Sequence, residues 1–253
     1  MTDSLTSVRK WKPYPNYKDS SIGWIDKVPN HWDVLPLFIL ARERKEKNDG
    51  NKVEEVLSLS YGKIVKRDVA ESSGLLPESF ETYQILQPGN IVLRLTDLQN
   101  DKRSLRVGLV GHRGIITSAY IGLELFSKIH STYAYYLLYA YDVTKVFYTF
   151  GGGVRQSMKF EDLKHLPILC PPIDEQQLIA VFLDSETRKI DNLISGLPTT
   201  QSGKGALMRL SDLLHEYRTA LIYAAVTGKI DVRGDLTEVD KVNPIPSRIS
   251  ATK

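Results

Sequence analysis

The sequence predicts an α+β fold: an irregular mixed α/β domain followed by a long helical, coiled-coil-like segment. Short apolar runs separated by Gly, Pro and Asn fill residues 56–169. The strands predicted there outnumber the helices and do not alternate with them, which argues against a doubly wound parallel sheet. After Pro171 and Pro172 the apolar residues recur at helical spacing, which is typical of amphipathic helices.

Composition narrows the class of protein. The 253 residues carry 33 Lys and Arg against 30 Asp and Glu, and the net charge of +3 allows nucleic-acid binding without implying it. The apolar fraction is typical of a soluble globular protein of one or two domains. No run reaches the roughly 18 apolar residues of a membrane span, and residues 1–20 lack the apolar stretch of a secretory signal. A single cysteine excludes an internal disulfide. We therefore expect a cytoplasmic protein.

Local patterns predict the individual elements of the first domain. Pro13 and Pro15 make residues 1–20 an extended arm. Asn30 is a candidate cap for a helix over 32–47, which ends in a charged run. Residues 133–142 are apolar all round and predict a buried helix. Short apolar runs bounded by turn residues predict strands at 56–59, 90–95, 107–110, 115–116, 122–126 and 166–170.

The C-terminal part predicts two helices. Asp174 is the expected N-cap of the first, with Gln177 at the capping-box position. Gly and Pro within 195–205 break the pattern, and Gly228 ends the second helix. In the second helix a heptad seam continues to Ala224. Such a seam must pack on another helix, so this part is expected to serve assembly. The apolar residues expected to face a partner helix are Ile179, Leu183, Ile190, Leu207, Leu210, Leu214, Tyr217 and Leu221.

No complete catalytic or metal site is recognisable in the sequence. The stretch 196–205 lacks the spacing of a phosphate-binding loop, and the three glycines at 151–153 do not form a dinucleotide fingerprint. No S-adenosylmethionine motif is present, and the five histidines lack metal-ligand spacing. A nuclease cluster would need Asp33, Glu43 and Lys45 to meet, although a charged helix surface explains the last two better. We therefore expect no catalytic residue, metal or cofactor in this chain.

Two polar segments and a short hydroxyl-rich run have the composition of a DNA-binding surface. Arg and Lys suit guanine and phosphate, Gln suits adenine, Thr suits the thymine methyl, and glycines allow close approach of the backbone. The N-terminal arm adds basic and aromatic groups suited to the DNA backbone. The expected DNA-binding residues are Arg94, Thr96, Gln99, Lys102, Arg103, Arg106, Thr117, Ser118, Tyr120, Gly152, Gly153, Arg155, Gln156, Ser157 and Lys159.

An ordered series of motifs resembles the specificity subunits of type I restriction–modification enzymes over about residues 20–233. The motifs are GWI at 23–25, VPNHW at 28–32, PGNIV at 88–92, GGGVRQS at 151–157, LPI at 166–168, PPIDEQQ at 171–177, KIDNLI at 189–194, YRTALI at 217–222 and AVTGKI at 225–230. The resemblance implies a noncatalytic subunit with a target recognition domain that grips one half of a split site in double-stranded DNA. It also implies a helical spacer that docks methyltransferase subunits.

The same resemblance places every cofactor on partner subunits. S-adenosylmethionine belongs to the adenine methyltransferase, and ATP and Mg²⁺ belong to motor-nuclease subunits. It divides the chain into an N-terminal arm (1–20), a target recognition domain (21–171), a helical spacer and dimerisation region (173–230) and a flexible tail (231–253).

Two departures from the family pattern bear on assembly. No second copy of the GGGVRQS or PPIDEQQ motif follows, so we expect a half-length subunit that forms a homodimer through its helices and reads an interrupted palindrome. The break at 195–205 stands where the family pattern predicts a continuous spacer helix. Two alternatives stay open: a self-contained nuclease or methyltransferase with an atypical site, and a pure adaptor or oligomerisation protein.

Overall fold

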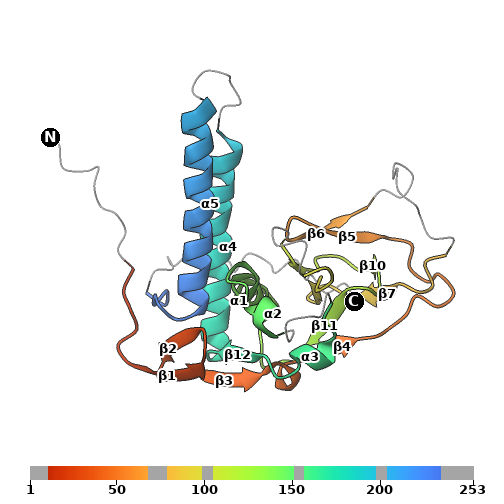
Figure 1. Cartoon of the computed structure of the whole chain (residues 1–253), viewed down its shortest axis with the longest axis horizontal. Coiled ribbons are helices and arrows are strands. Elements are labelled where there is room, and N and C mark those ends of the chain that lie inside the picture. The colour runs from red at the N-terminus through yellow and green to blue at the C-terminus, as the bar shows by residue number, and fades with distance from the viewer. Residues whose placement is uncertain (1–10, 68–78, 99–104, 151–156, 198–203, 235–253) are drawn as a thin grey trace.

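A computed structural model describes residues 11–67, 79–98, 105–150, 157–197 and 204–234. It confirms the predicted fold class: a mixed α/β domain carries a pair of long helices that stand out from it side by side (Figure 1). Within the described residues, no helix has both the length and the apolar character needed to cross a membrane.

The strands form small antiparallel sheets, of which the largest has four strands in the order β4-β11-β8-β9. The remaining pairs are β1 with β2, β3 with β12, β5 with β6, and β7 with β10. The strand bounds are β1 Tyr17–Ile22, β2 Ile25–Pro29, β3 Asp33–Pro36, β4 Ala41–Arg44, β5 Leu57–Ser60, β6 Lys63–Lys66, β7 Gln84–Leu86, β8 Ile91–Leu93, β9 Val107–Leu109, β10 Gly114–Ile116, β11 Ile121–Leu125 and β12 Pro167–Cys170.

The described helices comprise the shorter helices of the α/β domain, of which α1 is buried, and the long pair α4 and α5. Helix α1 buries residues on every side, as its apolar sequence predicts, and it contacts both long helices. The helix bounds are the 3-10 helix η1 Leu37–Ile39, α1 Ser131–Val143, α2 Val146–Phe150, α3 Phe160–Leu163, α4 Ile173–Ser195 and α5 Lys204–Val226.

Each predicted strand is present, but the helix expected over 32–47 is wrong. That stretch contains β3, η1 and β4 instead. Its charged residues find partners across the sheet, because β4 pairs with β11 and both Arg42 and Arg44 form ion pairs with Glu124. Tertiary pairing therefore overrides the helix propensity of the run.

The long helices form a hairpin whose lower half is anchored in the domain. The chain turns back between α4 and α5, at the predicted break. Helix α4 begins at Ile173 with Pro172 as its N-cap, so Asp174 lies in the acidic first turn rather than at the cap. At the end of α5, Gly228 adopts a φ of +71°. The amides of Gly228 and Lys229 donate to the carbonyls of Ala225 and Ala224, which closes the helix as predicted.

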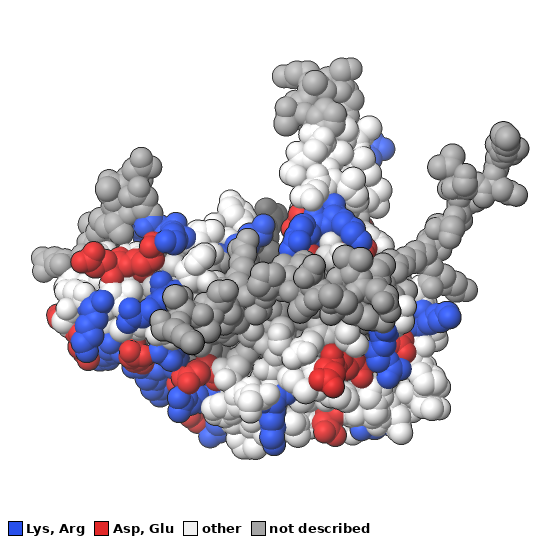
Figure 2. All heavy atoms as spheres, turned by 180° about the vertical axis from the view of Figure 1, so that it is seen from behind, with Lys and Arg blue, Asp and Glu red and all other residues white. Residues whose placement is uncertain are grey.

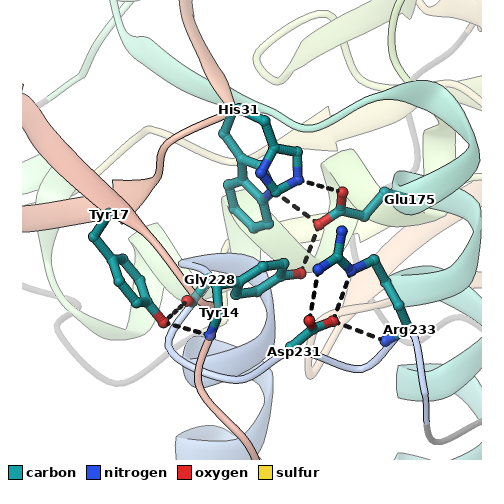
Figure 3. A network of polar contacts seen from close by, with 8 residues as sticks. Tyr14, Tyr17, His31, Glu175, Gly228, Asp231 and Arg233 are labelled. Carbon is teal, nitrogen blue, oxygen red and sulfur yellow. Dashed lines mark hydrogen bonds and ion pairs between the residues drawn. The ribbon is translucent and has the colours of Figure 1, made fainter.

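A polar network fastens both ends of the chain to the start of α4 (Figure 3). The carboxylate of Glu175 accepts hydrogen bonds from the Tyr14 hydroxyl at 2.6 Å and the Trp32 indole at 2.9 Å, and it lies 2.7 Å from the His31 ring. Burial and the hydrogen bond to Glu175 raise the pKa of Tyr14 far above its ordinary value, so its hydroxyl stays a donor. The guanidinium of Arg233 covers the Tyr14 ring.

The described parts of the predicted arm and tail pack against the rest of the fold. Tyr14 is buried, and the half-buried Trp11 packs edge-on against Phe182 of α4, so both aromatic rings pack within the fold and not on a separate DNA-facing arm. Val232 is fully buried, and the amide of Asp231 donates to the carbonyl of Lys12 at 2.7 Å. Residues 1–10 and 235–253 lie outside the described residues.

Candidate nucleic-acid interface

The register of the four-stranded sheet brings two of the predicted segments to one end: both ends of the polar segment 94–106, and the hydroxyl-rich run at 117–120. Strand β11 begins opposite the end of β8, where Ile121 pairs with Leu93, and opposite the end of β4, where Gly122 pairs with Arg44. Strand β9 begins beside the end of β8, where Val107 pairs with Leu93. The residues after β8, before β9 and before β11 therefore meet at the same end of the sheet.

The remaining predicted segment reaches the same end of the sheet through residues 157–158. Thr96 forms an isolated β-bridge with Ser157, and the amide of Met158 donates to the carbonyl of Leu95 at 2.9 Å. We call the resulting set of residues the polar end of the sheet. It comprises 94–98, 105–106, 117–120 and 157–159.

The turn at 117–120 is hydrogen-bonded to a buried side chain that was not among the residues predicted from the sequence. The amide nitrogen of Gln84 donates to the carbonyls of Thr117 and Tyr120 at 3.1 and 2.6 Å. Ser118 is exposed, and its hydroxyl donates to the carbonyl of Thr82. Thr117 and Tyr120 are half-buried. The turn is thus fixed in shape while part of its surface faces solvent.

Arg106 does not face outward as predicted. It is fully buried, and its guanidinium donates to the carbonyls of Arg94, Thr96 and Asp97 at 3.0, 2.8 and 3.3 Å. This arrangement excludes Arg106 from direct contact with DNA. Three carbonyls of one short segment converge on a single side chain, so Arg106 fixes the path of the chain after β8.

Two further partners of Arg106 come from α1 and α2. Its backbone amide donates to the carboxylate of Asp142 at 2.6 Å, and its Nε donates to the hydroxyl of Tyr148 at 3.2 Å. Asp142 is the lone carboxylate in an apolar helix, and this was a sequence signal for a buried polar partner. The hydrogen bonds that Gln84 and Tyr148 make to this end of the sheet had no comparable signal in the sequence.

The remaining predicted DNA-binding residues divide between exposed and undescribed ones. Ser157 and Lys159 are exposed, and Arg94 and Thr96 are half-buried. Lys159 stands at the N-cap of α3, where its amide donates to Asp162 at 2.9 Å. The predicted residues outside the described part of the chain are Gln99, Lys102, Arg103, Gly152, Gly153, Arg155 and Gln156.

Charge on the surface follows the division into two parts. Figure 2 shows Lys and Arg side chains mixed with Asp and Glu over the α/β domain, whereas the far half of the helical hairpin presents almost no charge on this face. Of the three nuclease candidates, Glu43 and Lys45 form an ion pair at 2.9 Å, and Asp33 lies in a different sheet. The described residues hold no group of three or more His, Cys, Asp or Glu side chains arranged for a metal ion.

The predicted helix seam is used in two ways. Ile179, Leu183, Ile190 and Leu221 are buried in the core of the chain itself, so they do not face a partner in this fold. Leu207 and Leu214 are half-buried on the same side of α5 as Leu221. Leu210 and Tyr217 are 44% and 49% exposed.

One segment of the chain matches a known protein family. Residues 107–199 match the sequence model of a family described as the type I restriction modification DNA specificity domain, Methylase_S. The matched segment is therefore similar to a domain that is described by its DNA specificity. Over this segment the chain is similar to the specificity family of type I restriction–modification systems, which the motifs of the sequence also resemble. None of the curated proteins matches it.

Three solved structures with partial similarity to this chain are described as type I restriction–modification proteins. One, from work on complex assembly and conformational transition of the type I R-M system, has 14% identity and a TM-score of 0.47 over 80% of this chain and 47% of that chain. The HsdS subunit from Thermoanaerobacter tengcongensis has 14% identity and a TM-score of 0.43 over 87% and 48%. The type I S subunit from M. genitalium has 17% identity and a TM-score of 0.43 over 69% and 42%. The matches cover less than half of each of these chains.

Proposed function

We propose that this chain is a half-length, noncatalytic specificity subunit that reads one half of a split target in double-stranded DNA. It forms a homodimer through its helices and directs methyltransferase and motor-nuclease subunits to the site in the cytoplasm. The observation that carries the proposal is the convergence of separate polar segments on one end of the sheet, in a chain that matches a DNA-specificity domain.

The chemistry of the polar end supports DNA reading. Lys159 and Arg94 supply cations for phosphate or guanine, while Thr96 and Ser157 supply hydroxyls beside them. Buried side chains beneath, Arg106 and Gln84, hold the backbone of two of these segments. A reader needs side chains presented at fixed positions, because base recognition depends on geometry.

The exposed side of α5 supports the homodimer. Leu210, Leu213 and Tyr217 are 44%, 61% and 49% exposed, and Ala206 and Ala220 extend the same stripe by one turn each. The five positions are spaced by four, three, four and three residues, which is a heptad pattern of its own. We call this set the outer stripe.

Charge complementarity favours a second copy as the occupant of the outer stripe. Arg209 and Glu216 flank it and are both exposed. A two-fold antiparallel pairing centred on Leu213 would bring Arg209 of one copy near Glu216 of the other, twice per dimer. Two recognition domains at opposite ends of such a pairing suit a split, inverted-repeat target.

DNA reading is tested by enrichment from a random DNA pool with the chain assembled on its methyltransferase subunits. We expect one split motif to be recovered, with binding that weakens as salt rises. Arg94→Ala should weaken binding to that motif by about tenfold, the magnitude typical of a contact worth ~1–3 kcal/mol. Arg42→Ala is the matched control, because Arg42 lies toward the other end of the sheet. Recovery of no motif would refute the reader.

The homodimer is tested by sedimentation velocity on the chain alone. Leu213→Glu should convert a dimer to a monomer, because it places a charge at the centre of the outer stripe. Met208→Glu is the control: Met208 is 66% exposed on the same helix but lies outside the heptad spacing of the stripe. A dimer that persists in Leu213→Glu, or a wild-type monomer, contradicts this interface.

A further inference from the structure

The turn of the β5–β6 hairpin exposes an aromatic ring in a backbone conformation that rarely carries one. Tyr61 is 91% exposed. Tyr61 and Gly62 form the two-residue connection between Ser60 and Lys63, with φ values of +47° and +74°. Two-residue hairpin turns with both φ values positive strongly favour Asn, Asp and Gly. A tyrosine there gains nothing from packing and adopts a disfavoured φ, so its ring calls for another explanation.

The hairpin turn lies beside the polar end of the sheet. A Cβ atom added to Gly62 would lie 3.1 Å from the Leu105 side chain, and the carbonyl of Gly62 accepts a hydrogen bond from Tyr135 of α1 at 3.4 Å. Leu105 directly precedes Arg106. The turn is therefore held next to the segment that Arg106 organises, and Figure 1 shows the hairpin projecting from the sheet toward the side of α1.

The strands of the hairpin approach β9 closely near the turn. A Cβ on Gly108 would fall within 2.6 Å of Leu59 and within 2.8 Å of Ile64, one residue from each strand of the hairpin. Only glycine allows the hairpin to sit this close to β9. The ring of Tyr61 is thus presented from a rigid support.

The charge on the hairpin fits a polyanion. Lys63 and Lys66 are exposed on β6, and Lys66 also pairs with Glu55 at 2.7 Å. A two-stranded ribbon is narrow enough to enter the major groove, lysines beside it reach phosphates, and an exposed aromatic ring stacks on a base or wedges between base steps.

We propose that the β5–β6 hairpin is a second DNA-contacting element, in which the ring of Tyr61 packs against a base of the half-site bound at the polar end. The inference rests on the proposed function and adds to it a contact from a separate hairpin. The ring of Tyr61 reads or distorts the DNA, while the ammonium group of Lys63 contacts a phosphate of the DNA backbone next to it.

The test uses substitutions that separate folding from binding. Tyr61→Asn removes the ring but places at the positive φ a residue that tolerates it, so the hairpin should be as stable as before or more stable. For the chain assembled with its methyltransferase subunits, we expect Tyr61→Asn to weaken binding to the enriched motif by about 5- to 150-fold. Tyr61→Trp should stay within about threefold of wild type, because the larger ring also stacks.

A substitution on the same hairpin supplies the matched control. Val65→Thr changes an exposed β6 side chain of similar size without touching a ring, and its affinity should equal that of wild type. 2-Aminopurine placed at successive positions of the motif should lose fluorescence at one position on binding wild type, and keep it on binding Tyr61→Asn.

The outcomes distinguish this inference from the proposed function. Sequence-specific binding by wild type, with unchanged affinity in Tyr61→Asn, overturns the hairpin contact alone. Loss of methyltransferase subunits from Tyr61→Asn, with unchanged DNA affinity of the chain itself, also overturns it and assigns the ring to a protein partner. Absence of any preferred motif for wild type refutes both.

Discussion

The polar end of the sheet and the heptad seam of α5 were both predicted to bind partners, and in both places the structure divides the predicted residues. At the polar end, Arg106 is buried while Lys159 and Ser157 are exposed. On α5, Leu221 is buried while Leu210 and Tyr217 are exposed. Residue type and spacing identified both regions, but only the packing decides which members remain available to a partner.

The buried members serve the exposed ones differently in the two regions. Arg106 donates to three carbonyls and so sets the shape of a surface that it does not join. Leu221 sits in the apolar core and fixes α5 to the domain. Substitution of Arg106 should therefore impair DNA recognition, whereas substitution of Leu221 should impair folding.

The largest effect is expected at the buried side of α5. Ile222 is fully buried, so Ile222→Ala should lower the free energy of unfolding by about 2–5 kcal/mol. Leu213→Ala, on the exposed side, should change it by less than about 0.5 kcal/mol. Urea unfolding at concentrations where the chain is a monomer measures both. Equal losses of unfolding free energy in the two variants would contradict the burial of one side of α5 and the exposure of the other.

The next effect separates shape from contact at the polar end. Arg106→Met should lower the free energy of unfolding by about 2–3 kcal/mol, because buried carbonyls lose their donor. It should also weaken binding to the specific motif more than binding to random DNA. Arg94→Ala should weaken specific binding with little change in stability. Anisotropy titrations and urea unfolding on the two variants give the comparison, and a stable Arg106→Met protein with normal specificity would contradict the positioning role.

A smaller effect contrasts the two ends of α5. Gly228 has a positive φ, and an added Cβ would collide with Pro29, so Gly228→Ala should cost about 1–3 kcal/mol. Gly205 lies in the first turn of α5, and an added Cβ would have no neighbouring heavy atom within 4 Å. Gly205→Ala should therefore raise stability by up to ~1 kcal/mol, because Ala favours the helix. Opposite shifts in the thermal midpoint are expected, and shifts of the same sign would contradict the anchoring of the α5 end.

The smallest effect concerns pH and the join between the domain and α4. Burial lowers the pKa of His130, whose backbone amide donates to Gln176 of α4 at 2.8 Å. The unfolded chain therefore takes up a proton at higher pH than the folded one, and stability falls as pH drops below about 6.5. His130→Asn should reduce this slope. Thermal midpoints measured from about pH 7 to pH 5 test it, and an unchanged slope would assign the pH dependence to other groups.

Much of the fold was predictable because its signals are local. The turn residues before 90–95 and the apolar run at 133–142 define their elements whatever surrounds them. The run at 40–47 misled because ion pairs with Glu124 exist only once β4 lies beside β11.

The residue types of the candidate site could be predicted from the sequence, but which of these residues are exposed could not. Arg94 and Arg106 have the same chemistry and lie in one segment, and nothing local shows that the second is enclosed by α1 and α2. Tyr61 was not singled out at all, because its exposure depends on where the β5–β6 hairpin packs. Gln84 was missed for the same reason, since its two acceptor carbonyls come from a turn 33 and 36 residues away.

The most direct test is a map of methylated adenines in cells that contain the chain with its methyltransferase subunits, compared with cells that lack the chain. We predict methylation on both strands of one split, inverted-repeat motif, and its loss when the chain is removed. Methylation that is independent of the chain, or confined to an unsplit and asymmetric motif, would contradict the account of a half-length reader acting as a pair.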